Sequence, residues 1–219
     1  MTALRWLRKH ALRWETYSAL TALVLFLMAA KWTLAPIFVE KGTFGIHDWD
    51  TSTAYRYISM LSMVRYHEGP WWSPWFCGGY PFWGYGESAP NVVSIFLPAY
   101  LLTSLPMALR IEIVGTAILG GVGAALLTGR LTRSWALKLF VAVIFALNGR
   151  FALQATSGHA WHLQYAYVPW VLYFVDRAFT GRMQNAFYAG IFLALMAYAG
   201  GIYPLPHAAL LTVGLCVVR

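Results

Sequence analysis

Long apolar runs recur along the chain and predict its architecture. A helix needs about 20 apolar residues to cross a membrane, whereas the strands of a membrane barrel alternate polar and apolar positions. The runs here are continuous and rich in Ala, Leu and Gly, which indicates helices. They lie near residues 16–38, 91–109, 111–129, 135–155, 163–178, 184–200 and 205–218. We therefore expect an all-α, polytopic membrane protein that forms a single module over residues 1–219, with 16–38 as the first span and 111–218 holding the remaining spans.

One long polar stretch, residues 39–90, separates the first run from the second. It holds five of the eight acidic residues and thirteen aromatic residues, which indicates a compact cap on the membrane surface rather than a tether. Within it, apolar residues at helical spacing, including Tyr57, Leu61 and Val64, predict an amphipathic helix over about 51–67. The plainest interpretation is an interfacial helix that lies flat on the membrane.

The distribution of Lys and Arg predicts the topology, because cytoplasmic segments carry an excess of basic residues. Four basic residues near the start place the N-terminus in the cytoplasm and the 39–90 loop outside. If 91–109 crossed the membrane, nine basic residues would lie outside and six inside. If this segment, which Pro98 and Pro106 interrupt, is re-entrant, ten lie inside and five outside. We prefer the re-entrant arrangement, which puts residues 158–162 on the same side as the 39–90 loop.

Composition and charge narrow the function classes. Only 11% of the residues are Asp, Glu, Lys or Arg, about half the usual share of a soluble domain. The formal net charge of +8 would suggest a nucleic-acid partner in a soluble protein. Here the basic residues lie at the ends of apolar runs and no nucleic-acid motif is present, so we expect membrane lipid as the surrounding partner and no nucleic acid. Cys77 and Cys216 do not form a disulfide framework.

The sharpest polar motif in the loop is His47-Asp48-Trp49-Asp50. Carboxylates at positions i and i+2 point the same way on extended backbone. Such a pair can share a divalent cation such as Mg²⁺ or Mn²⁺, or one member can act as a base. The alternative for Asp50 is a purely structural N-cap of the helix that follows. Asp48 has no comparable structural explanation in the sequence.

Three further groups of polar and aromatic residues have two interpretations each. Arg56 is either an ordinary basic residue of an interfacial helix that lies flat on the membrane, or it binds a lipid-borne phosphate. His159 and His162 are three residues apart and form either a metal pair on one helical face or hydrogen bonds at the interface, with no third metal ligand in view. The tryptophans of 71–75 form either a membrane belt or a platform for a sugar or a polyprenyl chain.

Several of these motifs occur together in a known order. His47-Asp48-Trp49-Asp50 is followed by Gly69-Pro70-Trp71-Trp72-Ser73-Pro74-Trp75, Cys77-Gly78-Gly79-Tyr80-Pro81, Gly158-His159 and Pro169-Trp170. In this arrangement the chain resembles the bacterial GT-C-type membrane glycosyltransferases, particularly the YfhO-like branch. The resemblance runs through most of the chain and is dense in 46–90 and 157–170.

The resemblance implies a transferase that takes a sugar from a polyprenyl-phosphate carrier on the outer face of the bacterial inner membrane. In that family an acidic residue of the first outer loop acts as base or binds metal, and Asp48 and Asp50 occupy the matching place. By the same analogy, His159 and Arg56 contact the carrier phosphate. Members of the superfamily are usually much longer, so the resemblance implies that this chain matches their N-terminal part, as a fragment, a truncated gene or a reduced paralogue.

Two other functions compete with the transferase. The first is a non-catalytic, multi-pass subunit with membrane protein partners, which the short length favours. The second is a transporter, which requires ionisable groups near the middle of the membrane. Lys31 and Glu112 are the candidates for such groups, and both lie near the ends of apolar runs, so we rank the transporter last.

Overall fold

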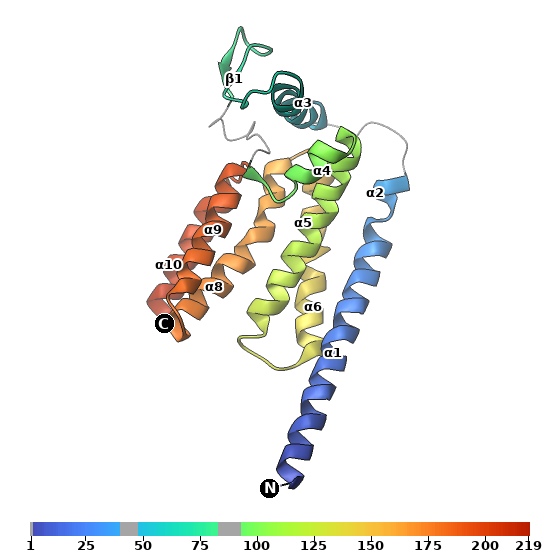
Figure 1. Ribbon diagram of the computed structural model, residues 1–219, viewed down its shortest axis with the longest axis vertical. Helices are drawn as coiled ribbons and strands as arrows, with labels where there is room; N and C mark the ends of the chain where they lie inside the picture. Colours follow the sequence, from blue (N-terminus) through green and yellow to red (C-terminus); the bar gives the residue numbers. More distant parts are fainter. Residues whose placement is uncertain (1, 40–47, 83–92) are drawn as a thin grey trace.

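The computed structural model describes residues 2–39, 48–82 and 93–219, which are mostly helical (Figure 1). Two antiparallel strands, β1 (Trp72–Ser73) and β2 (Tyr80–Pro81), are the exception within this part of the chain. The helices are α1 (Thr2–Leu34), α2 (Pro36–Val39), α3 (Trp49–Met60), η1 (Leu61–Arg65), α4 (Leu97–Leu102), α5 (Leu105–Thr128), α6 (Trp135–Ala146), α7 (Gly149–Thr156), η4 (Ala160–Tyr167), α8 (Val168–Thr180), α9 (Gln184–Tyr198) and α10 (Pro204–Val218). The prediction of a helical protein is confirmed.

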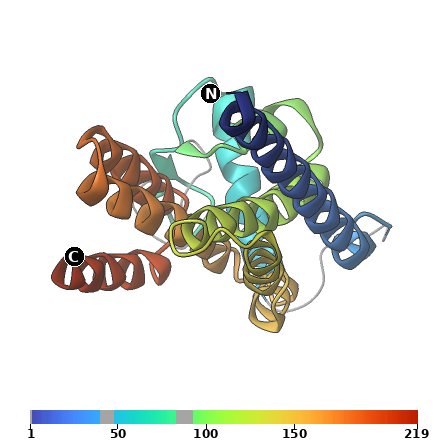
Figure 2. The ribbon, with the colours of Figure 1, turned by 90° about the horizontal axis from the view of Figure 1, so that it is seen from below.

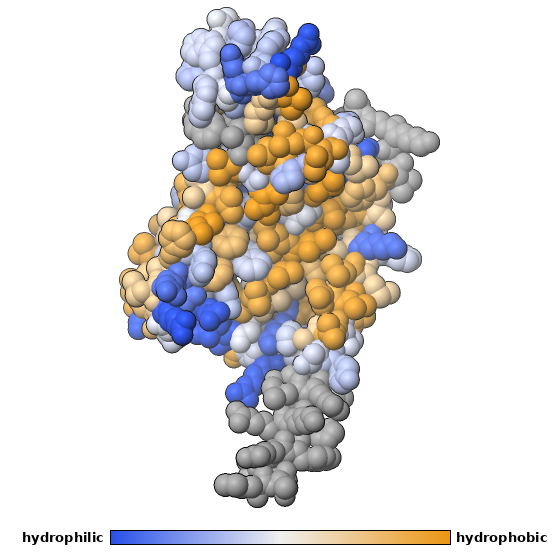
Figure 3. Space-filling view, in the orientation of Figure 1, coloured by the Kyte–Doolittle hydropathy of each residue, from blue (hydrophilic) through white to orange (hydrophobic). Residues whose placement is uncertain are grey.

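Three helical segments are long and apolar enough to cross a membrane: Thr16–Leu34, Leu105–Thr128 and Trp135–Thr156. The last comprises α6 and α7, and α10 is apolar but shorter. Hydrophobic side chains cover much of the bundle surface in Figure 3; hydrophilic patches lie toward its two ends, and a smaller one lies at mid-height on the right. A continuous apolar surface of this kind is what a helical membrane protein presents to lipid.

The segment predicted to be re-entrant divides into a short helix and the start of a long one. α4 has six residues and is therefore about 9 Å long, far less than the thickness of a bilayer. α5 begins at Leu105 rather than near residue 111, and Pro106 lies in its first turn. Because the first N–H groups of a helix have no intrahelical partner, proline is tolerated there. The break expected at Pro106 is thus a helix start.

α5 is the central helix, and its glycines admit aromatic rings from several neighbours. A Cβ atom added to Gly121 would lie 2.3 Å from Phe26 of α1, and one added to Gly123 would lie 2.6 Å from Trp170 of α8. These glycines lie on different sides of α5, where each makes room for an aromatic side chain.

Residues 48–82, which we call the cap, lie at the end of the bundle opposite the N-terminus (Figure 1). The cap contains α3, η1 and the β1–β2 hairpin. α3 begins at Trp49, two residues before the expected start, and η1 continues it as one π-helical turn. α4 and the N-terminal end of α5 lie beside the cap, so the chain returns into the bundle from that end.

Labelling of introduced cysteines tests the predicted topology. After replacement of the exposed native Cys77 and Cys216 by serine, a cysteine at Thr51 or Thr156 should react with a membrane-impermeant maleimide in intact cells. A cysteine at Arg133, at the other end of the bundle, should react only after permeabilisation. Labelling of position 156 only after permeabilisation would contradict the arrangement.

Candidate functional site

The centre of the candidate site is a contact between Asp48 and His159, which are far apart in the sequence. The Asp48 Oδ2 atom lies 3.1 Å from the His159 Nε2 atom. The Asp48 side chain is 50% exposed and the His159 side chain is 33% exposed, so a molecule in solvent can reach both. The structure therefore brings the cap and the 158–162 segment together, as the predicted topology required.

Three hydrogen bonds fix the start of α3 against the end of α7. The Asp48 N–H donates to the Ser157 carbonyl over 3.1 Å. The Ser52 hydroxyl donates to the Gly158 carbonyl over 2.6 Å, and the Trp49 indole N–H donates to the Ala155 carbonyl over 2.9 Å. Ser52 and Trp49 are buried, so water does not compete with these bonds. Asp48 is held in place by its backbone as well as by its carboxylate.

A second set of contacts fixes the His159 ring. Its Nδ1 atom is hydrogen-bonded to the Gln154 Oε1 atom of α7, and the ring stacks on Trp161 with 5.1 Å between centroids. A carboxylate beside an imidazole that a third group orients is an arrangement suited to proton transfer. The site thus consists of one exposed acid and one positioned histidine.

The structure separates Asp50 from Asp48. Asp48 occupies the N-cap position of α3 with φ −81° and ψ 7°, and Asp50 is exposed in the first helical turn. The extended backbone that would align the two carboxylates is absent, because the helix starts earlier than expected and positions i and i+2 diverge on a helix. The N-cap assignment of Asp50 was also wrong. Asp48 has that position but forms no capping hydrogen bond, since its carboxylate contacts His159.

The described residues do not provide a set of metal ligands. Within residues 2–39, 48–82 and 93–219, no three His, Cys, Asp or Glu side chains are placed to hold one ion. The rings of His159 and His162 have centroids 6.0 Å apart. His47, beside Asp48, lies outside the described residues. A Mg²⁺ or Mn²⁺ ion on Asp48 and Asp50 stays a prediction from the resemblance.

Arg56, expected to contact a phosphate, lies inside the protein. It is 7% exposed, and its Nε and Nη2 atoms contact the two carboxylate oxygens of Glu112 at 3.1 and 3.2 Å. Its Nε atom also lies 3.0 Å from the Tyr100 hydroxyl, which donates to Glu112. Burial opposes the charge on Arg56, but Glu112 and Tyr100 outweigh it and raise the pKa of the guanidinium above its ordinary value. Arg56 therefore joins α3 to α4 and α5.

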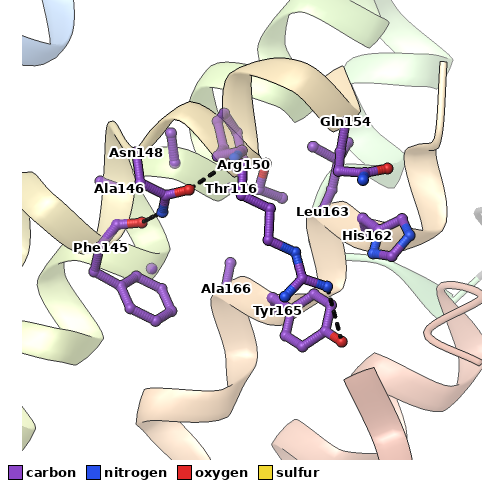
Figure 4. Close-up of a pocket in the computed structure, with 13 residues that line it drawn as sticks. Thr116, Phe145, Ala146, Asn148, Arg150, Gln154, His162, Leu163, Tyr165 and Ala166 are labelled. Carbon is purple, nitrogen blue, oxygen red and sulfur yellow. Dashed lines mark hydrogen bonds between the residues drawn. The ribbon is translucent and has the colours of Figure 1, made fainter. Parts of the chain in front are cut away.

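A cavity of about 180 Å³ lies beside His159, between α5, the corner of α6 and α7, and η4 (Figure 4). It shares Gln154 with the Asp48–His159 contact. Its walls are mainly apolar, with most of the polar side chains grouped on the α7 and η4 sides. Those residues are Asn148, Arg150, Gln154, His162 and Tyr165, and Thr116 of α5 is a further polar residue of the wall.

Two of these polar residues have capacity for a ligand. In Figure 4 the Arg150 side chain crosses the opening toward Tyr165, whose hydroxyl accepts a bond from Nη2 at 3.4 Å. The buried Nδ1 atom of His162 has no hydrogen-bond partner among the described residues, while its ring stacks between Tyr165 and Tyr203. Burial, together with the nearby Arg150 and His159, lowers the pKa of His162, so its ring is neutral at pH 7. A cation and a neutral nitrogen thus face one cavity.

The sequence did not single out Gln154 or Arg150 as site residues, and Glu112 was considered only as an ionisable group of a transporter. Gln154 and Arg150 lie in an apolar run that was expected to be one span; this run remains long enough to cross a membrane, but its helix breaks at Asn148 into α6 and α7. Asn148 caps α7 by accepting from the Phe151 N–H, and its amide donates to the Phe145 carbonyl. An asparagine within an apolar run was the available signal for this turn.

No protein-family model matches this sequence, and no significant match was found to a curated protein or to a solved structure.

Proposed function

We propose that the chain is the N-terminal module of a membrane glycosyltransferase that takes a sugar from a polyprenyl-phosphate carrier. The cap would lie on the extracytoplasmic face of the bacterial inner membrane. One observation carries the proposal: the exposed Asp48 carboxylate lies 3.1 Å from the positioned His159, at the end of an apolar helical bundle. A carrier with a lipid tail and a sugar headgroup reacts at such a boundary between lipid and water.

The residues of the site have separate roles in this proposal. Asp48 takes the proton from the acceptor hydroxyl as that oxygen bonds to the anomeric carbon. The bond from the anomeric carbon to the phosphate oxygen breaks, and the polyprenyl phosphate leaves with both electrons. His159 positions Asp48 through their 3.1 Å contact. In this proposal Arg150, rather than Arg56, contacts the carrier phosphate, because Arg56 is already paired with Glu112.

A divalent cation has no step in this mechanism. Asp48 and Asp50 diverge on the first turn of α3, and the described residues add no third ligand beside them. The charge on the leaving phosphate would be balanced by Arg150, whose guanidinium carries donors suited to phosphate oxygens.

Asp48→Asn tests the proposal, with Asp50→Asn as the matched control. The full chain, in membranes, is supplied with short polyprenyl phosphates that carry tritiated glucose, galactose, mannose or arabinose, and transfer of label is measured. Because general-base catalysis contributes about 10²–10⁴-fold, Asp48→Asn should lower the rate at least about a hundredfold. Asp50→Asn should stay within about twofold. A wild-type rate in Asp48→Asn would overturn the proposal.

A non-catalytic membrane subunit is the second candidate. The three hydrogen bonds between the start of α3 and residues 155–158 favour it. In that role the Asp48–His159 contact holds the cap on the bundle. The melting temperature of the purified protein distinguishes the two roles. If the chain is a subunit, Asp48→Asn should lower the melting temperature. The wild-type chain itself should then show no transfer activity toward any of the four donors. The transferase predicts a folded variant that has lost turnover.

A further inference from the structure

A second and larger cavity, of about 600 Å³, lies at the end of the bundle opposite the cap. α1, the C-terminal half of α5, the N-terminal half of α6 and α8 enclose it. Figure 2 shows the bundle from this end, with α1 on one side of α5 and α8 on the other. Much of the wall is apolar, with small side chains such as Ala22, Gly121 and Ala142 around Phe26. The wall thus has the shape and chemistry to accept a hydrocarbon chain.

Basic side chains line another part of the same cavity: Arg130, Lys138 and Arg177. The Lys138 ammonium lies 3.8 Å above the Trp135 ring, and Arg177 donates to the Tyr173 hydroxyl over 3.1 Å. In the described part of the chain neither Lys138 nor Arg177 has a carboxylate partner. These two cations are therefore open to an anion.

The nearby carboxylate is already neutralised. Asp176 is buried, its Oδ2 atom lies 2.6 Å from the Arg130 Nε atom, and its Oδ1 atom accepts a bond from Arg219. The two positive charges of Arg130 and Arg219 exceed the single negative charge of Asp176. This carboxylate therefore does not neutralise Lys138 or Arg177. The cavity has a net positive charge beside an apolar wall.

We propose that this cavity binds one anionic phospholipid of the membrane, with an acyl chain against α1, α5 and α6 and its phosphate between Lys138 and Arg177. Free phosphate would leave the apolar wall uncovered, and a zwitterionic lipid would not match the positive charge. Basic pockets between membrane helices on the cytoplasmic side recognise anionic headgroups in this way. The bound lipid would join α1 to the rest of the bundle. The proposal is independent of the transferase reaction at the other end.

Lipid retention by the purified full chain tests the proposal. Protein delipidated in neutral detergent is mixed with phosphatidylglycerol, phosphatidylcholine or inorganic phosphate, and native mass spectrometry counts bound lipid while the melting temperature is recorded. We expect one retained phosphatidylglycerol and a rise of several degrees, with neither effect from phosphatidylcholine. An equal rise with inorganic phosphate would identify a free-anion site and overturn the lipid assignment.

Variants of the two cations provide the second measurement. Lys138→Gln with Arg177→Gln should weaken phosphatidylglycerol binding about 30-fold, since each basic residue near an anionic lipid contributes about fivefold. Arg182→Gln, which changes an exposed arginine outside the cavity, is the matched control and should bind as wild type. The double variant should melt as wild type in phosphatidylcholine. Unchanged retention of phosphatidylglycerol in the double variant would overturn the proposal.

Discussion

Glu112→Ala should lower the apparent melting temperature of the detergent-solubilised protein by about 10 °C. The substitution leaves Arg56 buried without its partner, and removal of one member of a buried ion pair costs about 3–5 kcal/mol. For a chain of this size, each kcal/mol corresponds to roughly 2–4 °C. The protein is heated to a series of temperatures, and size-exclusion chromatography measures the folded protein that remains after each step.

The geometry of the pair explains why the effect should be large. Both side chains are almost fully buried, at 7% for Arg56 and 2% for Glu112, so neither charge has water to replace its partner. The guanidinium binds both carboxylate oxygens, and the Tyr100 hydroxyl binds the same carboxylate. Loss of Glu112 therefore removes a partner from two buried donors at once.

A double variant separates the cost of an unpaired charge from the value of the pair. Arg56→Met with Glu112→Leu removes both charges and keeps apolar volume, so it should recover most of the lost stability. Arg65→Met, at an exposed position of the cap, should melt as wild type. If Glu112→Ala also melts as wild type, the buried pair does not join the cap to the bundle. If Arg56 bound the carrier phosphate, its replacement would lower turnover more than stability.

The helical architecture was predictable from the sequence because it depends on local runs. Continuous apolar residues around 105–128 and 135–156 specify helices wherever the rest of the chain lies. The approach of the 158–162 segment to Asp48 was also predictable, since the count of Lys and Arg predicts that both lie on one side of the membrane. These inferences need no knowledge of individual contacts.

The partners within the site were not predictable, because they depend on residues distant in sequence. Arg56 and Glu112 are separated by 56 positions, and nothing in either local segment identifies the other as its partner. The roles of Asp48 and Asp50 depended on the residue at which α3 begins, and helix boundaries shift by a residue or two without a strong sequence signal. A shift of two positions moved the N-cap from one aspartate to the other.

Gly158→Ala should also lower the apparent melting temperature by about 10 °C, and it should release the start of α3 from the bundle. Gly158 has φ +79°, a conformation that costs an L-residue about 1–2 kcal/mol. Its added Cβ would lie 2.3 Å from the Trp49 nitrogen and 2.6 Å from the Asp48 carbonyl carbon. Both are backbone atoms, so no change of rotamer relieves the contact, and overpacking adds about 1–3 kcal/mol.

The displaced helix would carry Asp48 away from His159, which makes this variant a test of the site as well as of stability. Trypsin should cleave after the exposed Arg65 faster in Gly158→Ala than in the wild type, because the cap loses its three hydrogen bonds to residues 155–158. Gly149→Ala is the matched control, since its φ is helical and its Cβ would meet open space. That variant should melt and be cleaved as wild type. Equal melting and equal cleavage for the two variants would mean that packing against Gly158 does not hold α3 in place. The contact between Asp48 and His159 would then not depend on that packing.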